Sequence, residues 1–261
     1  MLCDTEAIVL IKSILAALAA VALVVAVAYV FKKYGKDDDE PDGATGSHVG
    51  AMLSALFLLI FAIALIVPWA AADEERKNTA AEAQALVEAY WDSGMLAEAD
   101  KQAVRTDIKA YLEHTVNTEF PRLKDGGDGL TQNTWQRLDQ LRTRLANLKI
   151  DDDHVNDARD DAVERIREVY SARRQRAVDT GPILPGGVLF FTVLTGIIMI
   201  VFPYLVGARP KGMPLVALGV MAALLGVSVY LCFDVNHVFR GALAVKADAF
   251  SDALNEIARI P

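Results

Sequence analysis

Four long apolar runs, set in two pairs on either side of a charge-rich segment, constrain this chain most. A helix needs about 20 mainly apolar residues to cross the roughly 30 Å hydrocarbon core of a bilayer. Residues 13–31, 49–72, 184–206 and 213–233 meet this requirement, and none of the four runs contains a charged residue. The sequence therefore predicts a multi-pass membrane protein with four transmembrane helices.

The first run has one competing interpretation, a secretory signal peptide, because residues 26–28 read Ala-Val-Ala and resemble a cleavage site. The run is too long for the core of such a peptide, and the acidic Asp4 and Glu6 precede it where basic residues are typical. We therefore expect 13–31 to be retained as a transmembrane helix.

The segment between the two pairs of runs shows helical periodicity and no strand pattern. Apolar side chains recur every three or four residues at Trp135, Leu138, Leu141, Leu145 and Leu148, which is typical of a helix packed on another helix. We expect four helices in this segment, packed as a water-soluble bundle.

The predicted fold class is all-α, a multi-pass membrane protein with a soluble helical bundle inserted between the second and third spans. The predicted parts are residues 1–72 with two spans and the polar loop 32–48, 73–180 with the bundle, 181–233 with the other two spans, and 234–261 as a C-terminal tail.

Charge is distributed unevenly along the chain, whose formal net charge is −8. Residues 73–180 carry 23 Asp and Glu against 17 Lys and Arg. Nucleic-acid binding needs a basic surface, so this acidic segment argues against a nucleic-acid partner. The expected surroundings are the lipid bilayer and other protein subunits.

Positive charge in the short loops predicts the membrane orientation, because cytoplasmic loops are enriched in Lys and Arg. Loops 32–48 and 207–212 carry Lys32, Lys33, Lys36, Arg209 and Lys211. We expect both loops in the cytoplasm and 73–180 on the other side of the membrane. An arginine cluster at 173–176, close to the third span, argues for the reverse orientation.

The two cysteines, Cys3 and Cys232, have two interpretations. Each can be a small apolar residue that remains a free thiol. In the expected orientation both lie near the outer interface, on the oxidising side, where a disulfide between them is the alternative.

No motif indicates an enzyme. The sequence lacks a zinc-protease, phosphate-loop, dinucleotide or nucleophile-elbow pattern. His48, His114, His154 and His237 each lack a second His or Cys at ligand spacing. We therefore predict no catalytic residue, no metal site and no cofactor.

The spans contain no ionisable residue apart from Lys12 at the edge of the first one. Proton-coupled transport needs titratable groups within the membrane, so this absence argues against it. A passive pore remains compatible, since a hydrophobic constriction is able to gate one. Such a constriction has four candidates, Phe57, Phe61, Phe190 and Phe191; the alternative is that these rings face lipid or pack between helices.

Three stretches follow one another in a recognisable order. Residues 79–86 read Thr-Ala-Ala-Glu-Ala-Gln-Ala-Leu, Arg105 and Tyr111 precede Glu-Phe-Pro at 119–121, and 233–241 read Phe-Asp-Val-Asn-His-Val-Phe-Arg-Gly. Placed between and after two pairs of spans, they resemble the bestrophin-like domain family of bacteria. The chain departs from the family pattern with Phe120 in place of Trp and Val238 in place of Pro.

The resemblance implies a bacterial cell-membrane protein related to the bestrophins, which are oligomeric anion channels. The residues that carry it are Arg105, Tyr111, Glu119, Pro121, Asp234, His237, Phe239 and Gly241. Each also suits a structural role as a core residue, a helix stop or a turn.

Two functions remain open at this point. The first is an oligomeric anion channel or pore, formed between subunits because one chain supplies only four spans. The alternative is a non-conducting membrane protein whose extracytoplasmic bundle binds a partner, or an accessory subunit of a larger membrane complex. The apolar stripe 135–148 and the small residues of 213–233 are the surfaces that suit the alternative.

Overall fold

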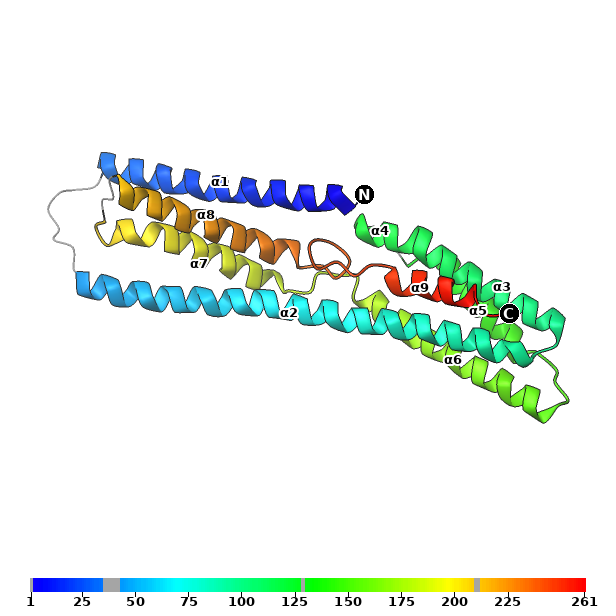
Figure 1. Ribbon diagram of the computed structural model, residues 1–261. Helices are drawn as coiled ribbons and strands as arrows, with labels where there is room; N and C mark the ends of the chain where they lie inside the picture. Colours follow the sequence, from blue (N-terminus) through cyan, green and yellow to red (C-terminus); the bar gives the residue numbers. More distant parts are fainter. Residues whose placement is uncertain (1, 35–42, 128–129, 209–211) are drawn as a thin grey trace. The chain divides into compact units, whose positions relative to one another are not determined.

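The computed structural model describes residues 2–34, 43–127, 130–208 and 212–261 (Figure 1). Within these ranges the chain is helical and contains no β-strand, which confirms the predicted all-α class. The long helices are α1 (Leu2–Tyr34), α2 (Gly43–Asp92), α3 (Glu98–His114), α5 (Gln132–Ala146), α6 (Asp153–Val178), α7 (Gly186–Leu205) and α8 (Met213–Asp234). The short ones are a 3₁₀ turn η1 (Ser93–Met95), a π-helical turn η2 (Thr115–Glu119), α4 (Phe120–Lys124) and α9 (Asp248–Ile257).

Among the described residues, three helices are long and apolar enough to cross a membrane: α2, α7 and α8. In α1 the apolar stretch with described side chains, Ile14–Val27, is shorter than a span requires. The fourth span, 13–31, therefore stays a prediction. Residues 35–42 and 209–211, in the two predicted cytoplasmic loops, lie outside the described ranges.

Helix α2 is much longer than a membrane span. At 1.5 Å per residue, its 50 residues extend over about 75 Å, whereas about 20 of them cover a bilayer core. Its apolar part ends at Ala72, and Asp73, Glu74 and Glu75 follow directly. The part of α2 beyond Ala72 is therefore too polar for the hydrocarbon layer.

The chain divides into two units, and the first comprises residues 1–69 and 183–236. In this unit α1, α7, α8 and the first part of α2 lie alongside one another (Figure 1). The core of the unit consists of Val24, Phe57, Ile200, Tyr204, Ala222 and Leu225. Helices α1 and α8 approach so closely that a Cβ on Gly226 would lie 2.7 Å from the carbonyl oxygen of Ala16. Only glycine fits at this position.

The second unit comprises residues 70–182 and 237–261. Its α3, α5, α6 and α9 pack with the later part of α2 around fully buried aliphatic and aromatic side chains: Leu86, Ile108, Leu112, Leu138, Leu141, Leu145, Ile166 and Phe250. The stripe expected at 135–148 thus supplies three core leucines. Leu148 lies beyond the end of α5 at Ala146.

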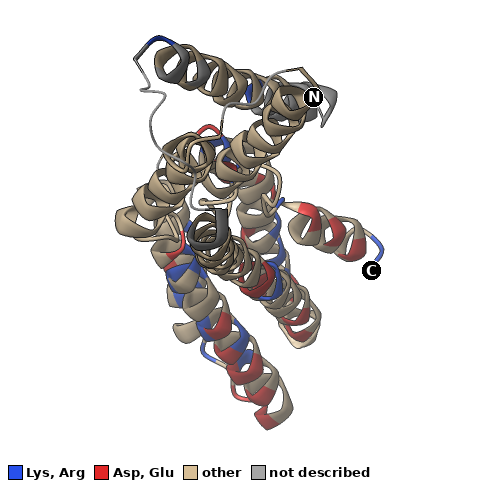
Figure 2. Cartoon of the chain, turned by 90° about the vertical axis from the view of Figure 1, so that its left-hand side faces the viewer, with Lys and Arg blue, Asp and Glu red and all other residues tan. Residues whose placement is uncertain are grey.

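Charged residues are concentrated in the second unit, where Figure 2 shows them along the helices. In the first unit, α7 has none and α8 has only its last residue, Asp234. Several of the charges in the second unit form surface pairs within a single helix, such as Arg167 with Glu164 at 2.7 Å. A few are buried, and these form the candidate site.

Candidate functional site

The candidate site begins with a local irregularity at the end of α3. Pro121 has no N–H group and cannot donate the α-helical hydrogen bond to the carbonyl of Asn117. The chain reaches this point through the π-helical turn η2, whose hydrogen bonds span one residue more than those of an α-helix. Glu119, the last residue of η2, is fully buried.

Glu119 forms a two-pronged ion pair with Arg173 of α6. Nη1 of Arg173 lies 2.9 Å from Oε2 of Glu119, and Nη2 lies 2.5 Å from Oε1. Both side chains are inaccessible to solvent. Two parallel charge-assisted bonds are the strongest arrangement that these two groups form.

A second buried pair lies one helical turn further along α6. Nη2 of Arg176 donates to Oε1 of Glu82, on α2, at 2.8 Å. The hydroxyl of Tyr111, on α3, donates to the same oxygen at 2.6 Å and accepts from Nη1 of Arg173 at 3.1 Å. Tyr111 therefore joins the two pairs into one network that links α2, α3, η2 and α6.

Aromatic rings enclose both guanidinium groups. Cζ of Arg173 lies 4.8 Å from the ring centre of Trp135. Cζ of Arg176 lies 5.2 Å from that of Phe250 and 5.5 Å from that of Phe120. Cations over aromatic faces are stabilised, and the rings also keep water away from the network.

The network holds two carboxylates and two guanidinium groups, so its charges balance. Burial by itself raises the pKa of Glu119, but the bonds and charge of Arg173 outweigh it and bring that pKa below its usual value. Burial, followed by the nearby Glu82 carboxylate, raises the pKa of the Tyr111 phenol, which stays protonated. Neither group is suited to exchange protons near neutral pH.

Glu75 behaves differently. It is fully buried on α2, accepts from Nδ2 of Asn78 at 2.9 Å and Oγ1 of Thr79 at 3.2 Å, and forms no ion pair among the described residues. Burial raises its pKa to about 7. Asn78 also donates to the carbonyl of Ala172 at 2.9 Å, so the Glu75 site ties α2 to α6.

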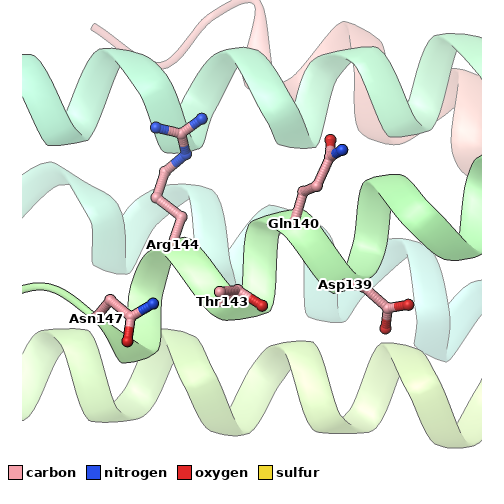
Figure 3. Close-up of a pocket in the computed structure, with 5 residues that line it drawn as sticks. All are labelled: Asp139, Gln140, Thr143, Arg144 and Asn147. Carbon is pink, nitrogen blue, oxygen red and sulfur yellow. The ribbon is translucent and has the colours of Figure 1, made fainter.

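A shallow depression on α5 does not form a site. Figure 3 shows that Gln140 and Arg144 point to the opposite side of the helix from Asp139 and Asn147. Two of these groups are also engaged: Nε of Arg144 lies 3.0 Å from Oδ2 of Asp107, and Asp139 accepts from the Tyr170 hydroxyl. In the described part of the chain, no group of three or more His, Cys, Asp or Glu side chains is placed to hold a metal ion.

Comparison with known families decides the classification. The family model of the bestrophin-like domain matches residues 15–250, which is most of the chain. The chain belongs to the bestrophin-like family. Neither the curated proteins nor the solved structures give a significant match. The resemblance seen in the sequence is confirmed, and with its long apolar helices this bestrophin-like chain is a membrane protein.

The residues that carry the bestrophin-like pattern fall into different environments. Tyr111 and Glu119 belong to the buried network, and Pro121 is exposed beside it. Arg105 lies outside the network: its Cζ stands 4.3 Å from the ring centre of Tyr90, and its Nη1 donates to the carbonyl of Pro261 at 2.5 Å.

The second half of the pattern follows α8. Asp234 accepts from the Tyr230 hydroxyl at 3.1 Å. Phe239 is buried, with its ring centre 6.0 Å from that of Phe120, and so fixes the segment after α8 to the second unit. His237 is half-buried, and Gly241 has a φ of +79°, which favours glycine.

The four phenylalanines proposed as a constriction form two separate pairs. The rings of Phe57 and Phe61 stack with their centres 6.0 Å apart and pack in the core of the first unit. The ring centres of Phe190 and Phe191 lie 5.5 Å apart, and the two side chains are 61 % and 54 % exposed. Among the ring contacts of the described residues, neither pair touches the other.

Cys232 is buried and forms no disulfide within the part of the chain whose side chains are described. The side chain of Cys3 lies outside the described part of the chain, so the disulfide between them stays a prediction.

Sequence reasoning missed Glu75, Glu82, Arg173 and Arg176. A signal was present on α6, where the apolar stripe Ala162, Ile166 and Val169 continues at the same spacing to residues 173 and 176. We interpreted these arginines as charges near the third span, whereas the structure buries both.

Proposed function

We propose that this bestrophin-like protein forms an ion-conducting pore between identical subunits. Each subunit would contribute four spans, 13–31, 49–72, 184–206 and 213–233, with 73–180 as a helical bundle on the extracytoplasmic side of a bacterial membrane.

The observation that carries the proposal is the contrast between the interior and the surface of the first unit. The core of the interior is formed by side chains such as Phe57, Tyr204 and Leu225, so the proposed path runs between subunits. On its surface, α7 exposes Phe190 and Phe191 and no charged group. These two phenylalanine side chains from every subunit, arranged around the pore axis, would make a hydrophobic constriction.

The buried network supports a structural role for the second unit in this assembly. Its pairs are balanced in charge and closed to solvent, and they hold α2, α3 and α6 together. The bundle would thus be a rigid support for the spans and not a route for protons.

The non-conducting alternative loses support from the same contacts. Three of the leucines of 135–148 that were to bind a partner, Leu138, Leu141 and Leu145, are buried in the second unit. Of the small residues on α8, Ala222 is buried and Gly226 lies against α1. Both surfaces are thus used in part within the chain, although a Cβ built on Gly219 of α8 would meet nothing within 4 Å.

Oligomeric mass in nanodiscs is the first test. We expect a closed ring of four or more subunits; a monomer or a dimer would overturn the pore. In liposomes that contain the ring, Phe190→Ala with Phe191→Ala should increase anion flux several-fold. Leu224→Ala, an equally exposed change on α8, serves as the control and should leave flux unchanged.

A further inference from the structure

A small polar pocket is lined entirely by residues of the second unit, and none of them belongs to the ion pairs of the buried network. Its volume is about 190 Å³. It is lined by the turn after α4, the end of α6 and the segment after α8, through Gly126, Gly127, Thr180, His237 and Arg240, above the apolar Leu123 and Phe239.

Arg240 rests directly on the turn after α4. Gly126 has a φ of +83°, and a Cβ built there would lie 2.6 Å from Nη1 of Arg240. A side chain at 126 would be strained by the backbone and would collide with the guanidinium. The glycine thus lets a cation lie against the backbone at the wall of the pocket.

No described residue pairs with that guanidinium. Arg173 and Arg176 of the same unit each bind a buried glutamate, whereas Arg240 has neither a hydrogen bond to its side chain nor an ion pair among the described residues. Two acidic residues, Asp125 and Asp179, adjoin the lining residues Gly126 and Thr180 in the sequence. Asp179 accepts from Nε2 of Gln175 at 3.1 Å, and neither forms an ion pair with Arg240.

His237 adds a second donor. It is half-buried, and burial together with the charge of Arg240 lowers the pKa of its imidazole. The neutral ring still carries one N–H group. The hydroxyl of Thr180 donates to the carbonyl of Ala177 at 3.0 Å, so its oxygen contributes only an acceptor.

We propose that this pocket binds a phosphate group, carried by a phospholipid headgroup or free in solution. A guanidinium fork matches two phosphate oxygens, and an imidazole N–H serves a third. The volume of about 190 Å³ leaves room for a phosphate group.

The sequence position of the pocket favours a lipid source. His237 is three residues beyond the end of α8 at Asp234, and a fully extended chain spans at most about 11 Å over that distance. The inference does not depend on ion conduction, since it requires only that α8 is a membrane helix.

Two binding measurements on the full-length protein in detergent test the proposal. Native mass spectrometry would count bound phosphatidic acid, and thermophoresis would measure binding of inorganic phosphate. Arg240→Gln should weaken whichever ligand binds by tenfold or more, since one charged hydrogen bond accounts for at least that factor. Arg167→Gln, which removes an exposed arginine paired with Glu164, is the matched control and should leave binding within twofold.

The outcomes separate the two sources. Phosphatidic acid binding without inorganic phosphate binding would identify a lipid site, and binding of both would identify a general phosphate site. If neither binds, or if Arg240→Gln binds like the wild type, the proposal is wrong. Should Arg240→Gln fail to fold, His237→Leu, which removes the imidazole N–H and is expected to weaken binding several-fold, decides in the same way.

Discussion

Glu119 and Arg173 show how this protein places charge in an apolar interior. Removing two ions from water costs several kcal/mol each, and their attraction offsets that cost only with good geometry and further hydrogen bonds. The paired bonds of Arg173, the Tyr111 hydroxyl and the Trp135 ring supply both. Stability therefore depends on every partner being present.

We expect Glu119→Ala to destabilise the protein strongly, because it leaves Arg173 as a buried charge without its carboxylate. The loss should be about 3–5 kcal/mol. Thermal unfolding in detergent, followed by helicity, would measure it. The control is Glu164→Ala, which removes an exposed partner of Arg167 and should cost less than ~1 kcal/mol.

A double variant refines this prediction. Glu119→Leu with Arg173→Met removes both charges and keeps a similar volume, so it should recover most of the stability lost in Glu119→Ala. If Glu119→Ala and Glu164→Ala unfold at the same temperature, the network does not have the role that its burial implies.

Glu75 should make stability depend on pH. Its pKa is about 7 in the folded protein and 4.5 as a reference for the unfolded chain. Between these values the folded state holds a proton that the unfolded state lacks, so stability falls as pH rises from about 4.5 to 7, by about 3 kcal/mol in all.

Glu75→Gln keeps the size of the side chain and cannot ionise. We expect the variant to match the wild type near pH 4.5 and to unfold at a higher temperature above pH 7. Glu119 contributes the opposite slope, lost as pH falls below 4.5, but it is common to both proteins and cancels in the comparison. A difference that does not change with pH would contradict the assignment.

At the scale of elements, α9 is attached to the second unit by one face. Phe250, Ala253 and Ile257 are its buried residues, and the Phe250 ring centre lies 5.7 Å from that of Phe120. The same ring covers the Arg176 guanidinium. Helix α9 therefore closes one side of the network.

Phe250→Ala should release α9, since truncating a buried phenylalanine costs about 3–5 kcal/mol. Hydrogen exchange of residues 248–257 should accelerate at least tenfold, while exchange in α7 stays the same. Asn255→Ala, on the exposed side of α9, is the control and should keep its protection. Unchanged exchange in Phe250→Ala would show that other contacts hold the helix.

Helix type and position were predictable because they follow from periodicity within a few turns. The leucines at 138, 141 and 145 identify α5 by themselves. The network was not predictable from the same rule, since Arg173 and Arg176 lie in an apolar stripe and only their distant partners Glu119 and Glu82 make burial favourable. The π-helical turn was also missed: Pro121 was interpreted as a helix stop, whereas the chain continues through it as α4.

For the whole molecule, the charge pattern predicts which side of the membrane each loop faces. Lys32, Lys33 and Lys36 in one short loop and Arg209 and Lys211 in the other favour the cytoplasm. Against them stood the arginines near the third span. Arg173 and Arg176 are buried in ion pairs with Glu119 and Glu82, so these two are neutralised and have little weight in the orientation.

Cysteine labelling of intact cells tests this orientation. In a variant without Cys3 and Cys232, a single cysteine replaces Asn147, exposed in the second unit, or Ala208, exposed after α7. A maleimide that cannot cross membranes should label Asn147→Cys in intact cells and Ala208→Cys only after lysis. Labelling of Ala208→Cys in intact cells would reverse the orientation, place the acidic bundle in the cytoplasm and put both cysteines on the reducing side, where a disulfide between them would not persist.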